Sequence, residues 1–194
     1  MCFHFGRSKD RIPYCERWSA GILPHQTGPG HVCQSPGQWL SLSRLGGKRE
    51  IMSIIGHGVA QGGTYTNNKP GVAAAYATLK LLTEKPILNT IEKRGQRLMD
   101  GLKDIFEEND SPAVFTGYPA MFSVSRGVKS VTCQRDWQES DRQMYLHLVE
   151  KAIGKGVMPD HDAREPWFLC YEHSDADIDE TLNVYAEIVK EVKK

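Results

Sequence analysis

The stretch "GGTYTNNKPGVAAAYATLKLL", from Gly62 to Leu82, places a glycine-rich turn directly before an alanine-rich helix. Pro70 is tolerated in a first helical turn, and Asn67 and Asn68 precede it as potential N-caps. Glycine lets the backbone come close to a ligand, and hydroxyl and N–H groups at a helix start suit an anion. The stretch therefore predicts either an anion-binding loop or a plain capping turn.

Length and composition limit the number of domains around this loop and the classes of partner that the protein can bind. The chain has 194 residues, 24 basic and 24 acidic side chains and no formal net charge. This length allows one large domain or two small ones, and the neutral balance argues against a nucleic-acid partner. No window is long and apolar enough to span a bilayer, and the N-terminus lacks a signal-peptide core. We therefore expect a cytoplasmic protein with no membrane partner.

The cysteines and N-terminal histidines predict neither a disulfide framework nor a metal site. Five irregularly spaced cysteines favour free thiols. The histidines and cysteines before Ser35 form no Cys-x-x-Cys or His-x₃-His pair, so we expect no metal ion there. The residues concerned are Cys2, Cys15, Cys33, Cys133 and Cys170, with His4, His25 and His31.

From Gly46 onward the sequence shows helix and strand patterns separated by turn signals, as in a folded α/β protein. Apolar spacing and helix start and stop signals predict helices over Lys48–Ile55, Pro70–Leu82 and Pro86 to near Asn109. A fourth helix is predicted from near Ser140 to Gly154 or Gly156, and a last one from Ser174 to the C-terminus. Short strands are expected at Ala113–Thr116, Ala120–Ser125, Val157-Met158 and Trp167–Tyr171. Within the third helix, the apolar stripe comprises Ile87, Ile91, Leu98, Leu102 and Ile105. Ser174 to Asp177 resembles a capping box for the last helix.

Residues 1–45 show no such pattern. Their apolar residues follow no sustained period, and a structureless stretch of this length is unusual inside a compact domain. A disordered arm is one interpretation, but Trp18 and Trp39 are unusual for a disordered tail. We expect this segment to be aberrant or disordered.

Residues 46–194 resemble the class III pyridoxal-phosphate (PLP) aminotransferases, and among them the glutamate-1-semialdehyde aminomutases. That family carries a Gly-Gly-(Lys/Arg)-x-Glu-(Ile/Leu)-Met helix, matched by Gly46–Met52, and then a Gly-Gly-Thr-(Tyr/Phe) loop, matched by Gly62–Tyr65. Further matches are Gly117–Phe122, Ser140-Asp141, Gly156–Met158 and "EHSDADIDETL" from Glu172 to Leu182.

The resemblance implies the C-terminal part of a fold-type I PLP-dependent transferase of class α/β. Residues 46–104 would be the end of the PLP-binding large domain, and residues 105–194 the small α/β domain. In the family the loop contacts the cofactor phosphate across a homodimer interface, which assigns the phosphate contacts to Gly63 and Thr64. Asn67 and Lys69 depart from the family pattern, which usually has Gly and Pro at these two positions.

The resemblance also implies the reaction, amino-group transfer through a cofactor aldimine on a small amino acid or amino ketone. The family's Schiff-base lysine and pyridinium-pairing aspartate lie upstream of the Gly-Gly-Lys helix. Neither motif occurs in residues 1–45, so no catalytic residue is assigned and the chain is expected to be inactive alone. The alternative is a non-catalytic fragment that acts only as a folding or dimerisation module.

An out-of-frame translation of residues 1–45 would explain the missing motifs. With permitted codons, "HVCQSPGQWLS" (His31–Ser41) read one base later gives Met-Tyr-Val-Lys-Ala-Leu-Gly-Asn-Gly-Phe-Pro. "FHFGRSKDRIP" (Phe3–Pro13) gives Phe-Ile-Leu-Asp-Glu-Val-Lys-Thr-Gly-Phe-Arg in the same frame. Both resemble the family's motifs and follow the family's order. Our hypothesis is that the proper frame resumes near Leu45.

For three further residues the sequence predicts a structural role rather than a catalytic one. Cys170 is expected to be a small buried residue rather than a nucleophile. His173, directly before the last helix, is expected to fix local hydrogen bonds. Arg164 belongs to a mixed-charge loop, which is typically solvated.

Overall fold

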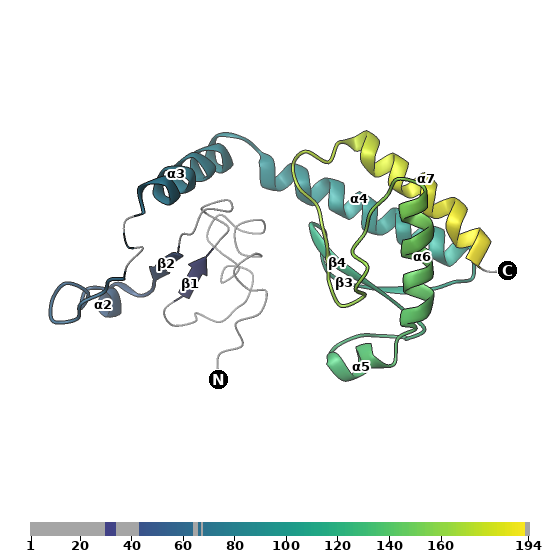
Figure 1. Cartoon of the computed structure of the whole chain (residues 1–194), viewed down its shortest axis with the longest axis horizontal. Helices are drawn as coiled ribbons and strands as arrows, with labels where there is room; N and C mark the ends of the chain where they lie inside the picture. The colour runs from purple at the N-terminus through teal and green to yellow at the C-terminus, as the bar shows by residue number, and fades with distance from the viewer. Residues whose placement is uncertain (1–29, 34–42, 64–65, 67, 193–194) are drawn as a thin grey trace. The chain divides into compact units, whose positions relative to one another are not determined.

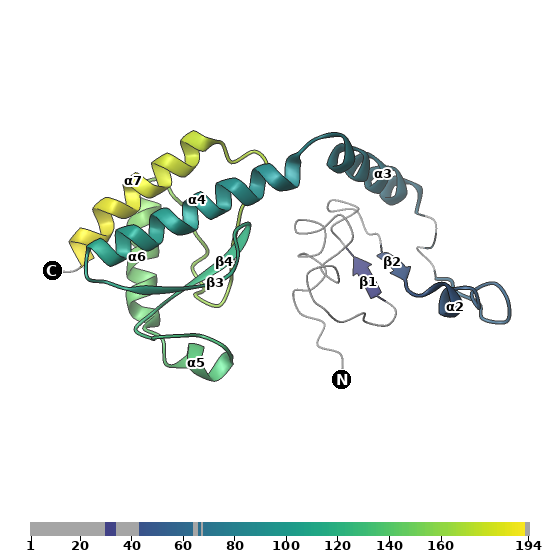
Figure 2. The same cartoon turned by 180° about the vertical axis from the view of Figure 1, so that it is seen from behind.

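The computed structural model describes residues 30–33, 43–63, 66 and 68–192. The chain divides into two compact units, Met1–Leu88 and Asn89–Lys194 (Figures 1 and 2). The predicted domain boundary lies after residue 104, so the C-terminal unit takes in more of the chain than the predicted small domain. The reason is the helix Ile87–Glu108, whose apolar face belongs to the core of the C-terminal unit.

The described part of the N-terminal unit begins with two short strands. β1 (Gly30–Cys33) pairs antiparallel with β2 (Ser43–Gly46), with Gly30 opposite Gly46 and Cys33 opposite Ser43. No regular structure was expected before Gly46, so this ladder is a finding of the structure. The helix expected over Lys48–Ile55 is only the single turn α2 (Arg49–Met52).

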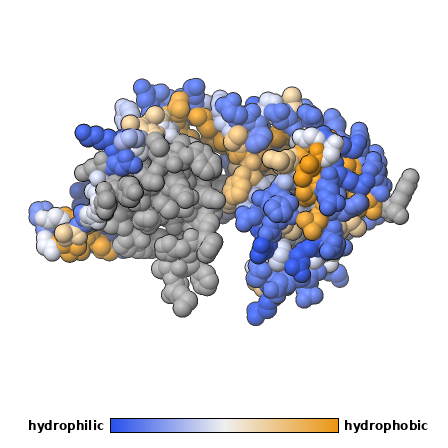
Figure 3. Space-filling model, viewed as in Figure 1, coloured by the Kyte–Doolittle hydropathy of each residue, from blue (hydrophilic) through white to orange (hydrophobic). Residues whose placement is uncertain are grey.

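Helix α3 (Lys69–Glu84) follows the glycine-rich loop, close to the predicted Pro70–Leu82. Only Gly71 and Ala75 are buried along it. Val72, Tyr76 and Leu79, at positions i, i+4 and i+7, are respectively 50%, 71% and 41% exposed. Figure 3 shows apolar surface along this helix. The residues therefore form an apolar stripe that the described chain leaves uncovered.

The C-terminal unit combines a small antiparallel sheet with three long helices. The sheet has the order β3-β4-β5, formed by Ala113–Tyr118, Met121–Arg126 and Trp167–Phe168. The long helices are α4 (Ile87–Glu108), α6 (Arg142–Gly154) and α7 (Asp175–Val192). Helix α6 contacts both α7 and β4. A short helix, α5 (Gln134–Gln138), lies between β4 and α6 in the chain.

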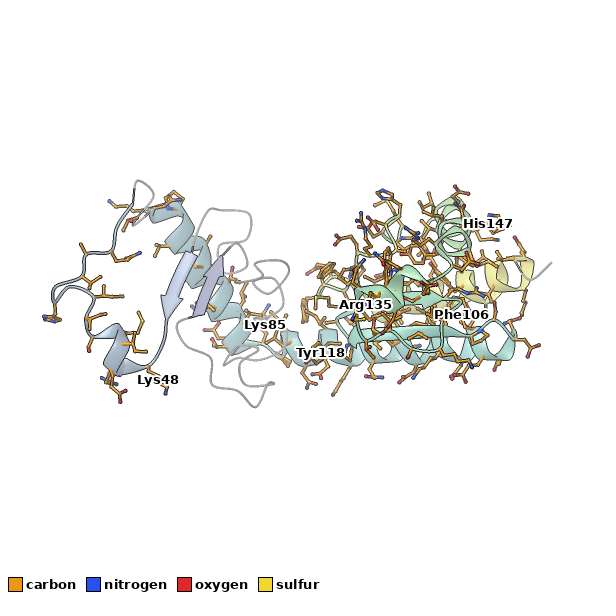
Figure 4. All side chains as sticks on the ribbon, turned by 90° about the horizontal axis from the view of Figure 1, so that it is seen from below. Lys48, Lys85, Phe106, Tyr118, Arg135 and His147 are labelled. Carbon is orange, nitrogen blue, oxygen red and sulfur yellow. The ribbon has the colours of Figure 1, made fainter. Side chains whose placement is uncertain are left out.

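One hydrophobic core holds this unit together. Phe106 of α4, labelled in Figure 4, is 1% exposed. The centroid of its ring lies 6.2 Å from that of Phe115 and 6.4 Å from that of Tyr185. The predicted α4 stripe is confirmed at Ile91, Leu98 and Leu102, which are buried. The members of the core larger than alanine are Leu98, Leu102, Phe106, Phe122, Val124, Tyr145, Leu148, Val149, Ile178, Tyr185, Ile188 and Val189.

A buried arginine borders this core. Arg126, the last residue of β4, is 8% exposed, and its guanidinium lies 5.3 Å from the centroid of the Phe106 ring. Nη2 donates to the Ser111 hydroxyl, whereas Nε and Nη1 find no hydrogen-bond partner among the described residues. Burial lowers the pKa of Arg126, and the nearby charge of Asp141 opposes this effect.

Three expectations about local structure have different outcomes. The capping box of α7 is confirmed, because Ser174 N and Oγ donate to Asp177 Oδ2 over 2.6 and 2.7 Å. Val157-Met158 is not a strand, and Met158 is 84% exposed. The strand expected over Trp167–Tyr171 is limited to Trp167 and Phe168, which pair with Phe122 and Met121.

Candidate functional site

The predicted anion loop lies at the start of α3. Gly63 is exposed, and its carbonyl accepts a hydrogen bond of 2.9 Å from the N–H of Thr66, which closes a turn before the helix. A side chain added at Gly63 would meet only Thr66 Oγ1, at 3.7 Å, and one at Gly62 would meet nothing within 4 Å. Thr64, the other predicted phosphate contact, lies outside the described residues.

The start of α3 suits an anion electrostatically. Its first turn contains no acidic residue, and Lys69 stands there with Pro70. The positive end of the helix dipole is therefore not neutralised by a carboxylate from the helix itself. Asn68 is the N-cap residue, and its side chain makes no capping hydrogen bond. The glycine turn, the helix terminus and Lys69 together fit a phosphate group.

A second concave region lies in the C-terminal unit, between α5, the start of α6 and residues 161–164. We call this region the α5–α6 hollow. Its volume is about 670 Å³, and Gln138, Trp137, Arg142 and Arg164 contribute to its walls. No sequence motif predicts this hollow, because its walls come from separate segments and include α5, a helix that was not expected.

Hydrogen bonds from Thr132 and Cys133 fix the start of α5. Asp136 Oδ2 accepts from Thr132 N, Thr132 Oγ1 and Cys133 N at 2.8, 2.6 and 3.2 Å. These bonds, with that from the Thr132 hydroxyl strongest, lower the pKa of Asp136 from 3.8 to about 2. This stabilisation is complete above the unfolded value of 3.8 and is lost as the pH falls toward about 2.

Thr132→Val is expected to move the pKa of Asp136 back toward 3.8, because the strongest hydrogen bond to the carboxylate is removed. The backbone N–H bonds from Thr132 and Cys133 remain, so a part of the shift should persist. Carboxyl-carbon NMR titration measures this change. Asp177, whose pKa is lowered by Ser174, serves as the internal reference and should not respond. An unchanged Asp136 titration in the variant would contradict the assignment.

Of the other predictions made for residues of the C-terminal unit, some are confirmed and one is wrong. His173 fixes local structure as expected, because its Nδ1 accepts a 2.9 Å hydrogen bond from Cys170 N. Cys170 is exposed, so the prediction that it is buried is wrong. The strand ends at Phe168 and places Cys170 in the loop that follows. Arg164 lies in an exposed charged loop and pairs with Asp162.

No cluster of metal-binding side chains occurs among the described residues. Cys2, Cys15, His4 and His25 lie outside them. Among the helices that the structure describes, none combines the length and the apolarity needed to cross a bilayer.

Comparison with known proteins identifies relatives of this chain. No protein-family model matches it. The glutamate-1-semialdehyde 2,1-aminomutase of Methanococcoides burtonii is 30% identical over 172 residues, which are 88% of this chain and 40% of the relative. Glutamate-1-semialdehyde 2,1-aminomutase 2 of Halalkalibacterium halodurans is 31% identical over 187 residues, 95% of this chain and 43% of the relative. The chain thus spans about two fifths of the length of these relatives.

These alignments are longer than residues 46–194, so they begin before Gly46. The similarity therefore takes in a part of the segment that sequence motifs alone place outside the family.

Solved structures show the same fold. A β-phenylalanine aminotransferase from Variovorax paradoxus superposes with a TM-score of 0.80 at 21% identity, over 92% of this chain and 42% of its own. The FumI protein of Sphingopyxis sp. MTA144, solved in its PLP internal aldimine form, gives 0.78 at 18% identity, over 95% and 42%. The chain is therefore related to the glutamate-1-semialdehyde aminomutases, and its α/β fold is that of the C-terminal part of a fold-type I PLP-dependent aminotransferase.

Proposed function

We propose that the loop from Gly62 to Thr66 is half of a PLP phosphate site in a class III aminotransferase or aminomutase. The observation that carries the proposal is the exposed glycine turn at the start of α3, with no acidic residue in the first helical turn. The backbone of Gly63 and the hydroxyl of Thr64 would donate to the phosphate. Bound PLP would supply the electron sink for chemistry at the substrate's amino group.

The proposed whole protein is a cytoplasmic homodimer that moves an amino group on a small amino acid or amino ketone. This chain alone would not complete such a site. Lys48, Lys69 and Lys80 do not occupy the position of the family's cofactor-binding lysine. Lys69 begins α3, and Lys80 forms an exposed i,i+4 pair with Glu84 at 3.8 Å.

A second candidate function is a non-catalytic module that folds or dimerises. The observation that favours it is the apolar stripe Val72, Tyr76 and Leu79 on α3, which the described residues do not cover. Such a surface is typical of a site of protein association. In this case the loop would remain a helix start without a cofactor.

The two candidates differ in how the chain responds to PLP. When PLP is added to the full chain and reduced with borohydride, we expect no single lysine to be labelled stoichiometrically, as judged by peptide mass spectrometry. Surface lysines should be labelled weakly and in parallel. Specific labelling of one lysine would overturn the proposal that the chain alone is inactive.

Binding of the phosphate is tested separately. If the loop is a phosphate site, inorganic phosphate should shift the backbone amide signals of Gly62 and Gly63 in NMR spectra. Gly63→Pro, which removes the N–H donor, should abolish the shift. Absence of saturable shifts in the unmodified chain would favour the non-catalytic module.

We also propose that residues 1–45 include an out-of-frame translation. Its support is the pair of ordered motifs that one shift of frame can yield from Phe3–Pro13 and His31–Ser41. The coding DNA tests it directly. If its plus-one frame does not spell both motifs, the hypothesis fails.

A further inference from the structure

The α5–α6 hollow carries an inference that is independent of the proposed PLP site. All of its walls belong to the C-terminal unit, and its volume of about 670 Å³ lies in the range of small-molecule sites. Its polar groups and its apolar groups define the kind of molecule that fits.

Trp137 forms a fixed apolar wall of the hollow. Its indole N–H donates to the carbonyl of Ala163 over 3.3 Å, so the ring is anchored between α5 and the 161–164 loop. The guanidinium of Arg142 lies 5.5 Å from the centroid of this ring, at a distance typical of a cation–π contact. The contact holds a positive charge at the wall of the hollow.

The charges of the hollow are not balanced. Arg164 and Asp162 satisfy each other, because the Asp162 carboxylate accepts from both the Nε and the backbone N–H of Arg164, at 2.9 and 3.0 Å through Oδ1. This pairing lowers the pKa of Asp162 to about 2 and keeps it ionised. Arg142 forms no ion pair with any described residue. The Asp141 carboxylate beside it accepts from Met144 N instead.

Other polar side chains of the lining carry N–H groups that can donate hydrogen bonds in addition to those of Arg142. Gln134 and Gln138 lie one turn apart on α5 and both line the hollow, and His161 lines it from the opposite loop. A guanidinium matches the planar, two-oxygen geometry of a carboxylate, and amide N–H₂ groups in the same lining can add hydrogen bonds. Leu146 and the Trp137 ring offer apolar contact to the rest of such a ligand.

We propose that the α5–α6 hollow binds a small organic monocarboxylate. Arg142 and Gln138 hold the carboxylate group, and the apolar body of the ligand packs against Trp137 and Leu146. A phosphate group is less suited, because a dianion would face the Asp162 carboxylate with only one unpaired arginine to balance it.

Sodium benzoate is a suitable probe, because it joins a carboxylate to a planar apolar body. In an NMR titration of the full chain, benzoate is expected to shift the Trp137 indole N–H and the Gln138 side-chain amide in a saturable way. Benzamide, which has the same shape without the charge, should bind at least about tenfold more weakly, as should inorganic phosphate. Equal binding of benzamide, or no saturable shift with benzoate, would overturn the proposal.

Single substitutions test whether benzoate binds in the α5–α6 hollow. Arg142→Gln should weaken benzoate binding at least about tenfold. Arg135, labelled in Figure 4, belongs to α5 but does not line the hollow. The Arg135→Gln variant removes a charge from α5 and should bind benzoate like the unmodified chain. Gln138→Glu adds a carboxylate to the hollow without touching the Arg142–Trp137 contact, and it should also weaken binding. If both hollow variants bind benzoate normally, the assignment is wrong.

Discussion

Gly95→Ala is expected to destabilise the C-terminal unit by about 3 kcal/mol or more, toward the upper end of overpacking effects. A Cβ at position 95 would lie 2.0 Å from the carbonyl oxygen of Pro119 and 2.4 Å from its carbon. These are backbone atoms of the β3–β4 turn, so no side chain can rotate away. Either α4 or the turn must move, and both belong to the core. Thermal denaturation followed by circular dichroism measures the effect.

Two alanine substitutions on other helical glycines are matched controls. At Gly101 the new Cβ would meet only the flexible end of Leu182, at 2.7 and 2.9 Å, so a smaller loss is expected. At Gly154 it would meet nothing within 4 Å, and alanine should be neutral or stabilising by up to about 1 kcal/mol. If the Gly95 variant is as stable as the Gly154 variant, the close approach of α4 to the turn is wrong.

Phe106→Ala is expected to cost about 3–5 kcal/mol, the range typical of a deleted buried aromatic side chain. The ring is 1% exposed and lies near the rings of Phe115 in β3 and Tyr185 in α7, so it joins three elements of the unit. Its loss also removes the aromatic face beneath Arg126, whose Nε and Nη1 have no other described partner. A cavity would therefore form beside a buried charge. Urea denaturation of the full chain gives the difference in unfolding free energy.

Met158→Ala is the control for this experiment. Met158 is 84% exposed, so its removal should change the unfolding free energy by less than about 0.5 kcal/mol. A Phe106 variant within that range would show that the core of the unit does not centre on α4.

The long helices of the fold were predictable because their sequences carry a complete local signal. Helix α7 begins at a capping box and repeats its apolar residues with helical spacing, and the helix observed from Asp175 follows the prediction. Helix α5 was missed because it is a single turn whose cap uses Cys133 and Thr132. The predicted boundary after residue 104 stays a prediction, since a periodic stripe indicates that one face of α4 is buried but not which part of the chain covers it.

The two candidate sites also differ in how far the sequence alone could predict them. Gly63 could be assigned from the sequence because its motif is contiguous, and the structure places it at the exposed start of α3. Its role as a phosphate contact stays a prediction, as does that of Thr64. The α5–α6 hollow brings Arg142 together with His161 and Arg164, and only the fold joins these segments.

If residues 1–45 include the proposed out-of-frame translation, the β1–β2 ladder lies at the end of that segment and continues to Gly46. Its cross-strand pairs join Gly30–Cys33 to Ser43–Gly46 through main-chain N–H and C=O groups, which every residue except proline supplies in full. A change of reading frame replaces the side chains but leaves those groups in place. On that proposal the main-chain hydrogen bonds of the ladder would outlast a change of frame, whereas the family's cofactor-binding lysine and aspartate each depend on a single codon.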